Sequence, residues 1–495
     1  MLWAIVCVLV CLWALTRSLY RVTFHPLSHI PGPKLAAISH ALEFYHDIIR
    51  GGRYIWEIEK MHEKYGPVVR INPREVHVKD PYFYDEIYAP SSRRRDKDPG
   101  FVGELGFKSS MIATIDHDLR YRRRRAMLNN FFSKQSVQRL WPVAQEKVDK
   151  LMMRFEQMYR QDIIVTLDDG YSALTGDIIS QYAWGQTAGY LEDATFKNDV
   201  RSALNELTNY SHVNRFFPSL GDTLLNLPRW VLGMIKPGAT ALLDLQDMVT
   251  ESRRMTRQGK HETLFHALSD TSVPPQERTP RRMADEGMVV VVAGTETTAR
   301  ALTIASYHLF NKSKSTLMKL REELGVVMPN ATTKPSWSEL EQLPYLTGVV
   351  YEAIRLSYGP IMRSTRVAPD EVLRYDNIQI PPGTPVSMST YFVHMDPNIF
   401  PDPHSFKPER WIEAAKRGYN LKRFLVAFSR GSRICLGMNL AYAELFMTLA
   451  ALVRRFDMEL YDSHPDDVRV DHEMGLAATK RKFGVRAKIT NVFTD

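Results

Sequence analysis

The chain has 495 residues, of which 44% are hydrophobic and 24% are charged, and its formal net charge is +8. This is ordinary globular composition, with ample material for a large core. Only three cysteines occur, two of them in the apolar N-terminus. A disulfide framework is therefore excluded, and a reducing compartment fits better than a secreted one. The basic residues are spread along the chain without a recognisable nucleic-acid-binding module, which argues against a nucleic-acid partner.

The N-terminus is an apolar segment. Residues 1–16 carry no charged side chain, and Arg17 and Arg21 follow. Because a bilayer core takes about 20 apolar residues, we predict a membrane anchor over residues 1–20. A cleaved signal peptide is the competing interpretation, but it requires positive charge before the apolar run and a small-residue cleavage site after it. The two arginines indicate, by the positive-inside rule, that the body faces the cytosol.

A proline-rich hinge is predicted over residues 21–33, because Pro26, Pro31 and Pro33 favour an extended, stiff connector. No internal repeat and no low-complexity tract follows. We therefore predict that residues 34–495 form one large domain.

Helix should dominate this domain. Residues 145–159 and 315–324 are rich in helix formers, and the second segment is expected to stop before Gly325. The prolines within residues 400–411 predict a shaped loop there. Short strands, which suggest a small sheet beside the helices, are predicted at residues 68–71, 76–78, 378–380 and 386–389.

Cys435 is the only cysteine outside the anchor and lies in a glycine-flanked loop. A single free cysteine is most often a small buried hydrophobic residue, and this is the simplest interpretation of Cys435. Its neighbours favour another role. Gly431 permits a tight turn and close backbone approach, while Arg430 and Arg433 supply positive charge that favours thiolate over thiol. We interpret this segment as a ligand loop.

The spacing F-x-x-G-x-R-x-C-x-G over residues 428–437 resembles the haem-ligating loop of the haem-thiolate monooxygenases, the cytochrome P-450 family, and matches it at every fixed position. The resemblance implies a mainly α fold with a small β region, in which residues 34–495 are the catalytic domain. It makes Cys435 the proximal iron ligand of haem b, where a thiolate favours cleavage of the dioxygen bond. Arg433 would pair with a haem propionate, Phe428 would pack near the sulfur, and Gly431 belongs to the same cofactor loop.

In the segment 288–299, residues 288–293 are apolar, and Glu296 follows between the hydroxyl side chains of Thr295 and Thr297. By periodicity the valine run fits a buried strand as well as a helix. Residues 293–298 are similar to the long distal helix of the same family, which implies a helix weakened by Gly294 and bent by the Thr297 hydroxyl bonding the carbonyl four residues earlier. Glu296 and Thr297 would then relay protons. The alternative is a helix interior whose hydroxyls are satisfied by the backbone.

Glu352 and Arg355 place opposite charges three residues apart. As an exposed pair they would contribute only a few tenths of a kcal/mol. In the family, such a pair is buried and completed by an arginine from a downstream loop. Residues 406–411 resemble that loop, so Arg410 is expected as the third member. We assign these three residues to structure and haem retention.

The arginine run at residues 120–125 fits a nucleic-acid patch by composition alone. The residues that follow resemble the family's helix beside the haem, which implies that Arg125 and Tyr121 face the propionates. Tyr121 departs from the tryptophan or histidine that is usual there. Residues 357–366 resemble the strand bordering the haem, so Arg366 is expected as a further propionate contact. The other arginines of the run are expected to be exposed, either steering an acidic reductase or forming a solvated face.

The resemblance as a whole implies a monooxygenase that takes electrons from NADPH through a flavoprotein reductase and oxidises a hydrophobic small molecule. The expected location is the endoplasmic reticulum membrane, with the body in the cytosol. Segments such as 381–388 and 440–445 look like fungal enzymes of secondary metabolism, with oxygenases of the sesquiterpene trichodiene as the nearest likeness. This indicates a terpenoid or polyketide substrate. A haem-thiolate isomerase or dehydratase and a non-enzymatic haem- or lipid-binding protein remain as alternatives.

Overall fold

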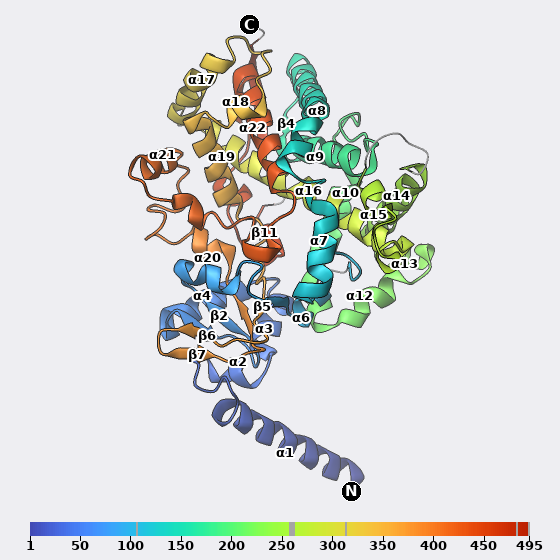
Figure 1. Ribbon diagram of the computed structural model, residues 1–495, viewed down its shortest axis with the longest axis vertical. Helices are drawn as coiled ribbons and strands as arrows, with labels where there is room; N and C mark the ends of the chain where they lie inside the picture. The colour runs from blue at the N-terminus through green and yellow to red at the C-terminus, as the bar shows by residue number, and fades with distance from the viewer. Residues whose placement is uncertain (105–106, 257–262, 312–313, 482–483, 494–495) are drawn as a thin grey trace.

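The computed structural model describes residues 1–104, 107–256, 263–311, 314–481 and 484–493. Helices dominate, and a small β-rich region lies between the N-terminal helix and the larger helical body (Figure 1). The helices of the N-terminal part are α1 (Leu2–Thr23), α2 (Lys34–Ile38), α3 (Ala41–Phe44), α4 (Tyr54–Tyr65), α5 (Tyr84–Ile87), α6 (Pro99–Glu104) and α7 (Arg122–Asn129).

The remaining helices form most of the body. Those of the middle region are α8 (Lys134–Arg160), α9 (Leu167–Trp184), α10 (Asp199–Asn209), α11 (Ser211–Phe216), α12 (Pro218–Leu225), α13 (Arg229–Ile235), α14 (Thr240–Thr256) and α15 (Leu264–Ser269). Those that follow are α16 (Pro280–Leu309), α17 (Ser315–Val327), α18 (Trp337–Leu340), α19 (Pro344–Ser357), α20 (Thr390–His394), α21 (Glu409–Lys416) and α22 (Met438–Arg455).

The strands in the described part of the chain are short and fall into four small sheets. One sheet has the order β1-β2-β8-β5-β3, in which only the β2–β8 pair is parallel. A second has the order β4-β12-β9, and β6–β7 and β10–β11 are separate pairs. The strands are β1 (Val68–Arg70), β2 (Val76–Val78), β3 (Asp96–Lys97), β4 (Val165–Thr166), β5 (Arg366–Val367), β6 (Leu373–Tyr375), β7 (Ile378–Ile380), β8 (Pro385–Ser387), β9 (Phe456–Leu460), β10 (His472–Met474), β11 (Leu476–Ala478) and β12 (Arg486–Val492).

Helix α16 runs through the centre of the body and packs against α9, α19 and α22. The valine run is therefore helical, because neighbouring helices bury it on several sides. Gly294 permits the close approach of α9, since a Cβ at this position would lie 2.7 Å from the Ile179 side chain. Gly294 also lines the cavity described below.

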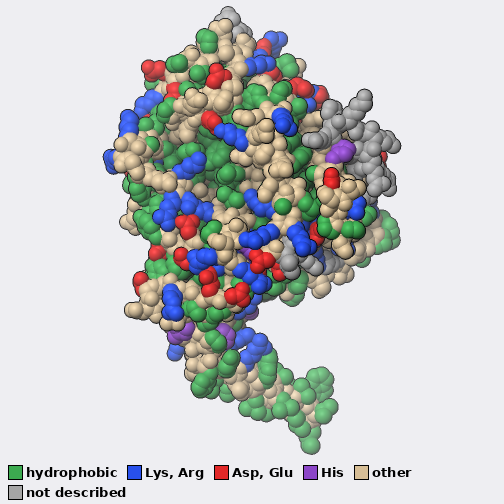
Figure 2. Space-filling model, in the orientation of Figure 1, with side chains coloured by type: hydrophobic (Ala, Val, Ile, Leu, Met, Phe, Trp, Pro, Cys, Tyr) green, Lys and Arg blue, Asp and Glu red, His purple; other side chains and the backbone are tan. Residues whose placement is uncertain are grey.

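Helix α1 projects from the body and contains no buried residue. Its side chains are hydrophobic from Leu2 to Leu15, and Figure 2 shows mainly hydrophobic surface along the projecting helix. At 1.5 Å per residue its 22 residues span about 33 Å, enough to cross a bilayer core. Among the described residues, α16 also passes the length and hydropathy test for a span, but most of it is buried in the body.

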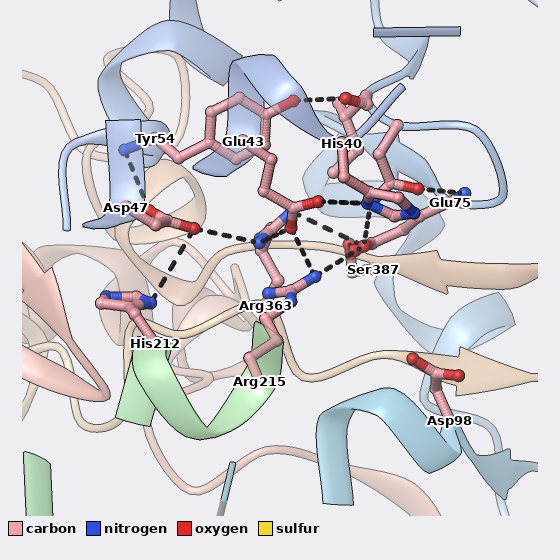
Figure 3. Close-up of polar contacts among 12 residues, drawn as sticks. His40, Glu43, Asp47, Tyr54, Glu75, Asp98, His212, Arg215, Arg363 and Ser387 are labelled. Carbon is pink, nitrogen blue, oxygen red and sulfur yellow. Dashed lines mark hydrogen bonds and ion pairs between the residues drawn. The ribbon is translucent and has the colours of Figure 1, made fainter. Parts of the chain in front are cut away.

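A buried charged cluster joins the N-terminal segments to α11 (Figure 3). The Arg363 guanidinium donates to Glu43 Oε1 at 2.7 Å, and Arg215 of α11 lies 2.6 Å from the same oxygen. Ser387 of β8 donates to Glu75 Oε1 at 2.7 Å. The two arginines hold the pKa of Glu43 well below its usual range against the opposing effect of burial. This network fixes α11, which packs against α6 at the edge of the cavity.

The strands predicted at residues 76–78 and 378–380 are β2 and β7, with the same bounds. Those predicted at residues 68–71 and 386–389 correspond to β1 and β8, with ends that differ by one or two residues. The predicted helix over residues 145–159 is part of α8.

Three local predictions need correction. Helix α17 continues through Gly325 to Val327, because the buried Leu320 and Leu324 hold its inner face and one glycine costs only about 1 kcal/mol. The loop predicted for residues 400–411 ends at Pro408, where α21 begins. The hinge is not extended, since α1 continues to Thr23 and hydrogen-bonded turns follow it.

Candidate active site

A cavity of about 370 Å³ lies between the loop that carries Cys435 (residues 428–437, the cysteine loop), α16 and the start of α22. Its walls are mostly apolar. Val289, Val290 and Ala293 of α16 form part of the wall, and Phe101, Met111 and Ile112 from earlier segments also line it. Such a cavity suits an apolar molecule, with the few polar groups determining its orientation.

Cys435 faces this cavity and lies in a loop that its own backbone shapes. Gly431 has φ +67°, and a Cβ there would meet the Ala89 carbonyl oxygen at 2.0 Å, so only glycine fits. The Cys435 N–H donates to the Phe428 carbonyl at 2.8 Å, which closes the loop. Cys435 keeps accessible surface because it faces the cavity, and Phe428 lines the cavity beside it.

The electrostatics of the loop differ from the expectation drawn from Arg430 and Arg433. Burial raises the pKa of the Cys435 thiol, opposed by a backbone N–H and by Arg125. Arg430 instead pairs with Asp85 at 3.1 Å. Local arginines therefore do not by themselves stabilise a thiolate here. A bound metal cation would, because coordination deprotonates a thiol outright.

Three buried cationic side chains, Lys97, Arg366 and Arg433, line the same cavity. Lys97 and Arg366 are directly opposite each other on β3 and β5, an arrangement that is destabilising for like charges. Burial, aided by Arg433 and Arg366, lowers the pKa of Lys97 well below its usual range, and burial lowers the pKa of Arg433 to about 9. Within the described part of the chain no ion pair joins any of the three to a carboxylate. Buried charges of one sign call for an anionic partner, and the two propionates of haem fit this arrangement.

The other predicted propionate contacts are beside this group. Tyr121 is buried and lines the cavity, and the Arg433 guanidinium lies 4.3 Å from the centre of its ring. Arg125 donates to the Tyr121 hydroxyl at 3.0 Å and to the Ile434 carbonyl at 2.5 Å, so it joins α7 to the cysteine loop. Arg433 donates to the carbonyls of the segment before α7. The structure thus brings together Cys435, Phe428 and the four predicted propionate contacts.

The rest of the arginine run is divided between surface and core. Arg122 and Arg123 are exposed, as expected. Arg124 is buried and pairs with Glu277 at 2.7 Å, which corrects the expectation that it would be exposed. No local pattern around Arg124 indicates this difference, because Glu277 is distant in the chain. The side chain of Arg120 lies outside the described residues.

Thr297 lines the cavity, and its hydroxyl donates to the Ala293 carbonyl at 2.8 Å, as expected. Glu296 does not line it. The Glu296 carboxylate accepts a hydrogen bond from Ser172 at 3.2 Å and lies 3.5 Å from Arg201 Nε. Burial raises the pKa of Glu296, and Arg201 opposes this effect. The two residues of the predicted proton relay therefore lie on different faces of α16.

Three charged residues that line the cavity were not predicted from the sequence: Lys97, Glu286 and Glu444. Glu444 follows Cys435 by nine residues on α22, and this nearness to the cysteine loop is the one local signal that could have identified it. Burial raises the pKa of Glu444 well above its usual range, while a hydrogen bond with Thr298 acts in the opposite direction. No local motif surrounds Lys97 or Glu286, because their roles depend on contacts between distant segments.

The buried scaffold predicted around Glu352 is present. Arg355 Nε donates to Glu352 Oε2 at 2.9 Å, and Arg410 Nε lies 2.5 Å from the other carboxylate oxygen. Glu352 and Arg355 are fully buried. Arg355 also donates to the carbonyls of His394 and Pro403, so α19 is fixed to the segment that leads to the cysteine loop.

Comparison with known proteins agrees with this geometry. The family model described as Cytochrome P450 matches residues 31–486. The chain is 47% identical to the cytochrome P450 monooxygenase TRI4 of Trichoderma arundinaceum over 467 residues, which covers 93% of this chain and 90% of that protein. It is 47% identical to conidiogenone synthase PchP450 of Penicillium rubens, with 96% of both chains covered, and 43% identical to the cytochrome P450 monooxygenase aflU of Aspergillus parasiticus, also with 96% of both covered. The chain therefore belongs to the cytochrome P450 family.

Proposed function

We propose that this protein is a membrane-anchored haem-thiolate monooxygenase that inserts one oxygen atom from O2 into a hydrophobic terpenoid or polyketide of fungal secondary metabolism. The observation that carries the proposal is that Cys435 faces an apolar cavity whose buried cations lack carboxylate partners among the described residues. Family membership over residues 31–486 and the names of the fungal relatives support the same activity.

Bound haem supplies the iron at which O2 is activated, with electrons delivered from NADPH through a flavoprotein reductase. In the proposed site Cys435 holds the iron, Phe428 packs beside its sulfur, and Gly431 permits the turn of the loop. The propionates are bound by the cationic and phenolic group formed by Lys97, Tyr121, Arg125, Arg366 and Arg433.

The apolar walls exclude bulk water, so proton supply requires a defined route. Thr297 holds a hydroxyl at the cavity wall and is the proposed donor side chain. For Glu296 to take part, its carboxylate must leave Ser172 and Arg201 and turn toward the cavity. We propose that this rotation lets the Glu296 carboxylate carry protons from the far side of α16 to the Thr297 hydroxyl.

We further propose that residues 1–20 anchor the protein in the endoplasmic reticulum membrane, that residues 21–33 are a hinge, and that residues 34–495 form the catalytic domain in the cytosol. The apolar surface of α1 and the arginines that follow it support this orientation. The exposed Arg122 and Arg123 offer positive charge to an acidic reductase surface.

The test begins with the full-length protein purified with its haem. We expect the reduced carbon-monoxide spectrum of a thiolate-ligated iron, and its loss in Cys435→His, while Cys7→Ser and Cys11→Ser retain it. With reductase and NADPH, products should form only in the presence of O2. The compounds to supply come from metabolite profiling of a fungal host that expresses the chain. Turnover without O2 would indicate an isomerase or dehydratase, and haem binding without any turnover would indicate a binding protein.

A further inference from the structure

Helix α11 is bound to neighbouring segments by two ionisable side chains (Figure 3). Arg215 lies 2.6 Å from the Glu43 carboxylate of α3. His212 lies 3.8 Å from the Asp47 carboxylate, and its Nε2 is 2.7 Å from the carbonyl oxygen of Glu473 in β10. These contacts hold α11 to the buried charged cluster, whose members are Glu43, Asp47, Glu75, His212, Arg215, Arg363 and Glu473.

The cluster contains more carboxyl groups than permanent cations. Its four carboxyl groups are buried, and the guanidinium groups of Arg215 and Arg363 supply permanent positive charge. His212, and the partly exposed His40 beside Glu43, are charged only when protonated. Two guanidinium groups cannot neutralise four buried carboxylates, and a buried carboxylate without a cation takes up a proton. The arrangement of charges therefore favours a bound proton within the cluster.

Asp47 is the carboxyl group placed to take this proton. Its Oδ1 accepts a backbone N–H at 3.3 Å, but Oδ2 is buried and accepts no hydrogen bond from any residue within the described ranges. Burial raises the pKa of Asp47 to about 6. The charged groups that face it are His212 and Arg363, which lower its pKa, and Glu473 and Glu43, which raise it. Because Asp47 and His212 face each other, the proton belongs to the pair.

The cluster lies behind the cavity wall. The Arg363 guanidinium points into the cluster, while its chain neighbours Met362 and Ser364 line the cavity. The Gly475 carbonyl accepts the Met362 N–H at 3.4 Å, and the Glu473 carboxylate accepts the Gly475 N–H at 2.5 Å. Helix α11 also packs against α6, which supplies another part of the wall. A change in the cluster is therefore transmitted to the wall through direct contacts.

We propose that the cluster is a proton-sensitive latch: a proton held by Asp47 and His212 keeps α11 closed against the cavity wall, and its loss lets both loosen. The latch does not depend on the chemistry proposed at Cys435. It makes the opening of the cavity wall respond to pH.

Acid should favour the closed latch. When α11 moves away, water reaches Asp47 and its pKa returns toward the ordinary value of 3.8. The closed cluster then binds the proton more tightly than the open one, so opening becomes easier as the pH rises through about 6. From these two pKa values, the ratio of open to closed protein should be about tenfold higher at pH 7.5 than at pH 5. Glu43 acts in the opposite direction, but only below its ordinary pKa near 4.5.

The test is hydrogen exchange of the haem-loaded full chain in lipid nanodiscs, followed by mass spectrometry at pH 5 and pH 7.5. Each exchange rate is divided by the intrinsic rate at the same pH, so that only opening is compared. We expect residues 211–216 and 361–364 to be about tenfold less protected at pH 7.5, and residues 440–450 of α22 to be unchanged. Equal protection at the two pH values would overturn the latch, and this comparison requires no variant. A change confined to residues 211–216 would overturn its coupling to the wall.

Asp47→Asn is a nearly isosteric mimic of the protonated acid. It should keep residues 211–216 protected at both pH values, so that the tenfold difference falls to within about twofold. Asp467→Asn is the matched control, because burial also raises the pKa of Asp467 to about 6 but this residue lies outside the cluster. This variant should retain the wild-type difference. A full pH response in Asp47→Asn, with folding verified by its carbon-monoxide spectrum, would contradict the role of Asp47.

His212→Gln tests the pair from the other side. The amide can still donate to the Glu473 carbonyl, but the imidazole that lowers the pKa of Asp47 is gone. The midpoint of the exchange transition should therefore move to higher pH, and an unchanged or lower midpoint would contradict the pairing. Failure of the proposed function gives a different result, because a protein without a thiolate spectrum or O2-dependent turnover disproves the monooxygenase whatever its hydrogen exchange.

Discussion

At the scale of single residues, the site combines positions of two kinds. Gly431 and Cys435 belong to one short motif, and the backbone conformation that the motif requires is present in the loop. Lys97 and Glu286 belong to no motif and reach the cavity only because distant segments meet. A sequence pattern can therefore predict a residue whose partners are local in the chain. It cannot predict one whose partners come from elsewhere.

Thr297→Ala is predicted to uncouple electron consumption from oxidation. Removal of the hydroxyl from the cavity wall should lower product formed per NADPH roughly tenfold to a hundredfold, because a positioned proton donor contributes at least this much. Haem content and the carbon-monoxide spectrum should be retained. Thr295→Ala is the matched control, since Thr295 makes the same back-bond to its helix at 2.7 Å but does not line the cavity. Coupled turnover at the wild-type level in Thr297→Ala would contradict the relay.

At the scale of secondary-structure elements, two contacts hold α19 and α20 to the segments that precede the cysteine loop. The Glu352 carboxylate forms ion pairs with Arg355 of the same helix and with Arg410 at the start of α21. His394 of α20 accepts the Val426 N–H at 2.9 Å, just before the cysteine loop. The first contact was predictable from a sequence motif. The second was not, because a single histidine without metal-ligand spacing carries no signal.

Glu352→Gln is predicted to destabilise the protein strongly. It leaves Arg355 buried and weakens the contact to Arg410, and breaking a buried pair in this way costs about 3–5 kcal/mol. Urea unfolding monitored by circular dichroism, together with the rate of haem loss, measures the effect. Asp402→Asn is the control, because its pair with Lys407 is largely exposed and should matter little. Equal effects of the two substitutions would contradict the structural role of Glu352.

Acidification is predicted to loosen the contact between α20 and the cysteine loop. Burial lowers the pKa of His394 to about 3. The imidazole therefore stays neutral in the folded protein at pH values where the unfolded chain takes up a proton, near and below pH 6.5. The stabilisation is complete above pH 6.5 and is lost as the pH falls. Between pH 7 and pH 5 this histidine should account for about 2 kcal/mol of lost unfolding free energy.

His394→Gln tests this pH dependence. The amide oxygen can still accept the Val426 N–H but takes up no proton, so the difference in unfolding free energy between pH 7 and pH 5 should shrink by about 2 kcal/mol. His464→Gln should leave the difference unchanged, because the His464 side chain is 57% exposed. The idea fails if His394→Gln and the wild-type protein lose the same free energy on acidification.

At the scale of the whole molecule, the apolar helix α1 is separate from the body. It contains no buried residue, and its contacts with the body are made near its end, where Arg21 bonds the Ile38 carbonyl and Arg70 donates to the Arg21 carbonyl at 2.8 Å. The body therefore does not require residues before Tyr20 for its packing.

Deletion of residues 2–19 is predicted to abolish carbonate-resistant membrane binding without changing the carbon-monoxide spectrum. The reason is that the deleted residues supply the only exposed apolar helix of bilayer length among the described residues. Cell fractionation followed by carbonate extraction measures the outcome. An unrelated apolar segment of 20 residues fused in place of the deleted one should restore binding. Undiminished carbonate resistance after the deletion would place the anchor elsewhere.

The sequence by itself determined the features that are encoded locally. These are the apolar N-terminal segment, the dominance of helix, the short strands, the cysteine loop and the charged pair at Glu352 and Arg355. Each depends on residues within about ten positions of one another, where periodicity, glycine and spacing have direct physical consequences. The helical state of the valine run came from resemblance alone, since its local pattern allowed a strand.

Only the tertiary structure decided which side chains share the cavity. It placed Glu296 against Arg201 on the far side of α16, buried Arg124 against Glu277, and brought Lys97 opposite Arg366 across two strands. These outcomes depend on pairings between segments far apart in the chain. Burial makes such pairings decisive, because a charge removed from water must find its partner wherever the fold provides one.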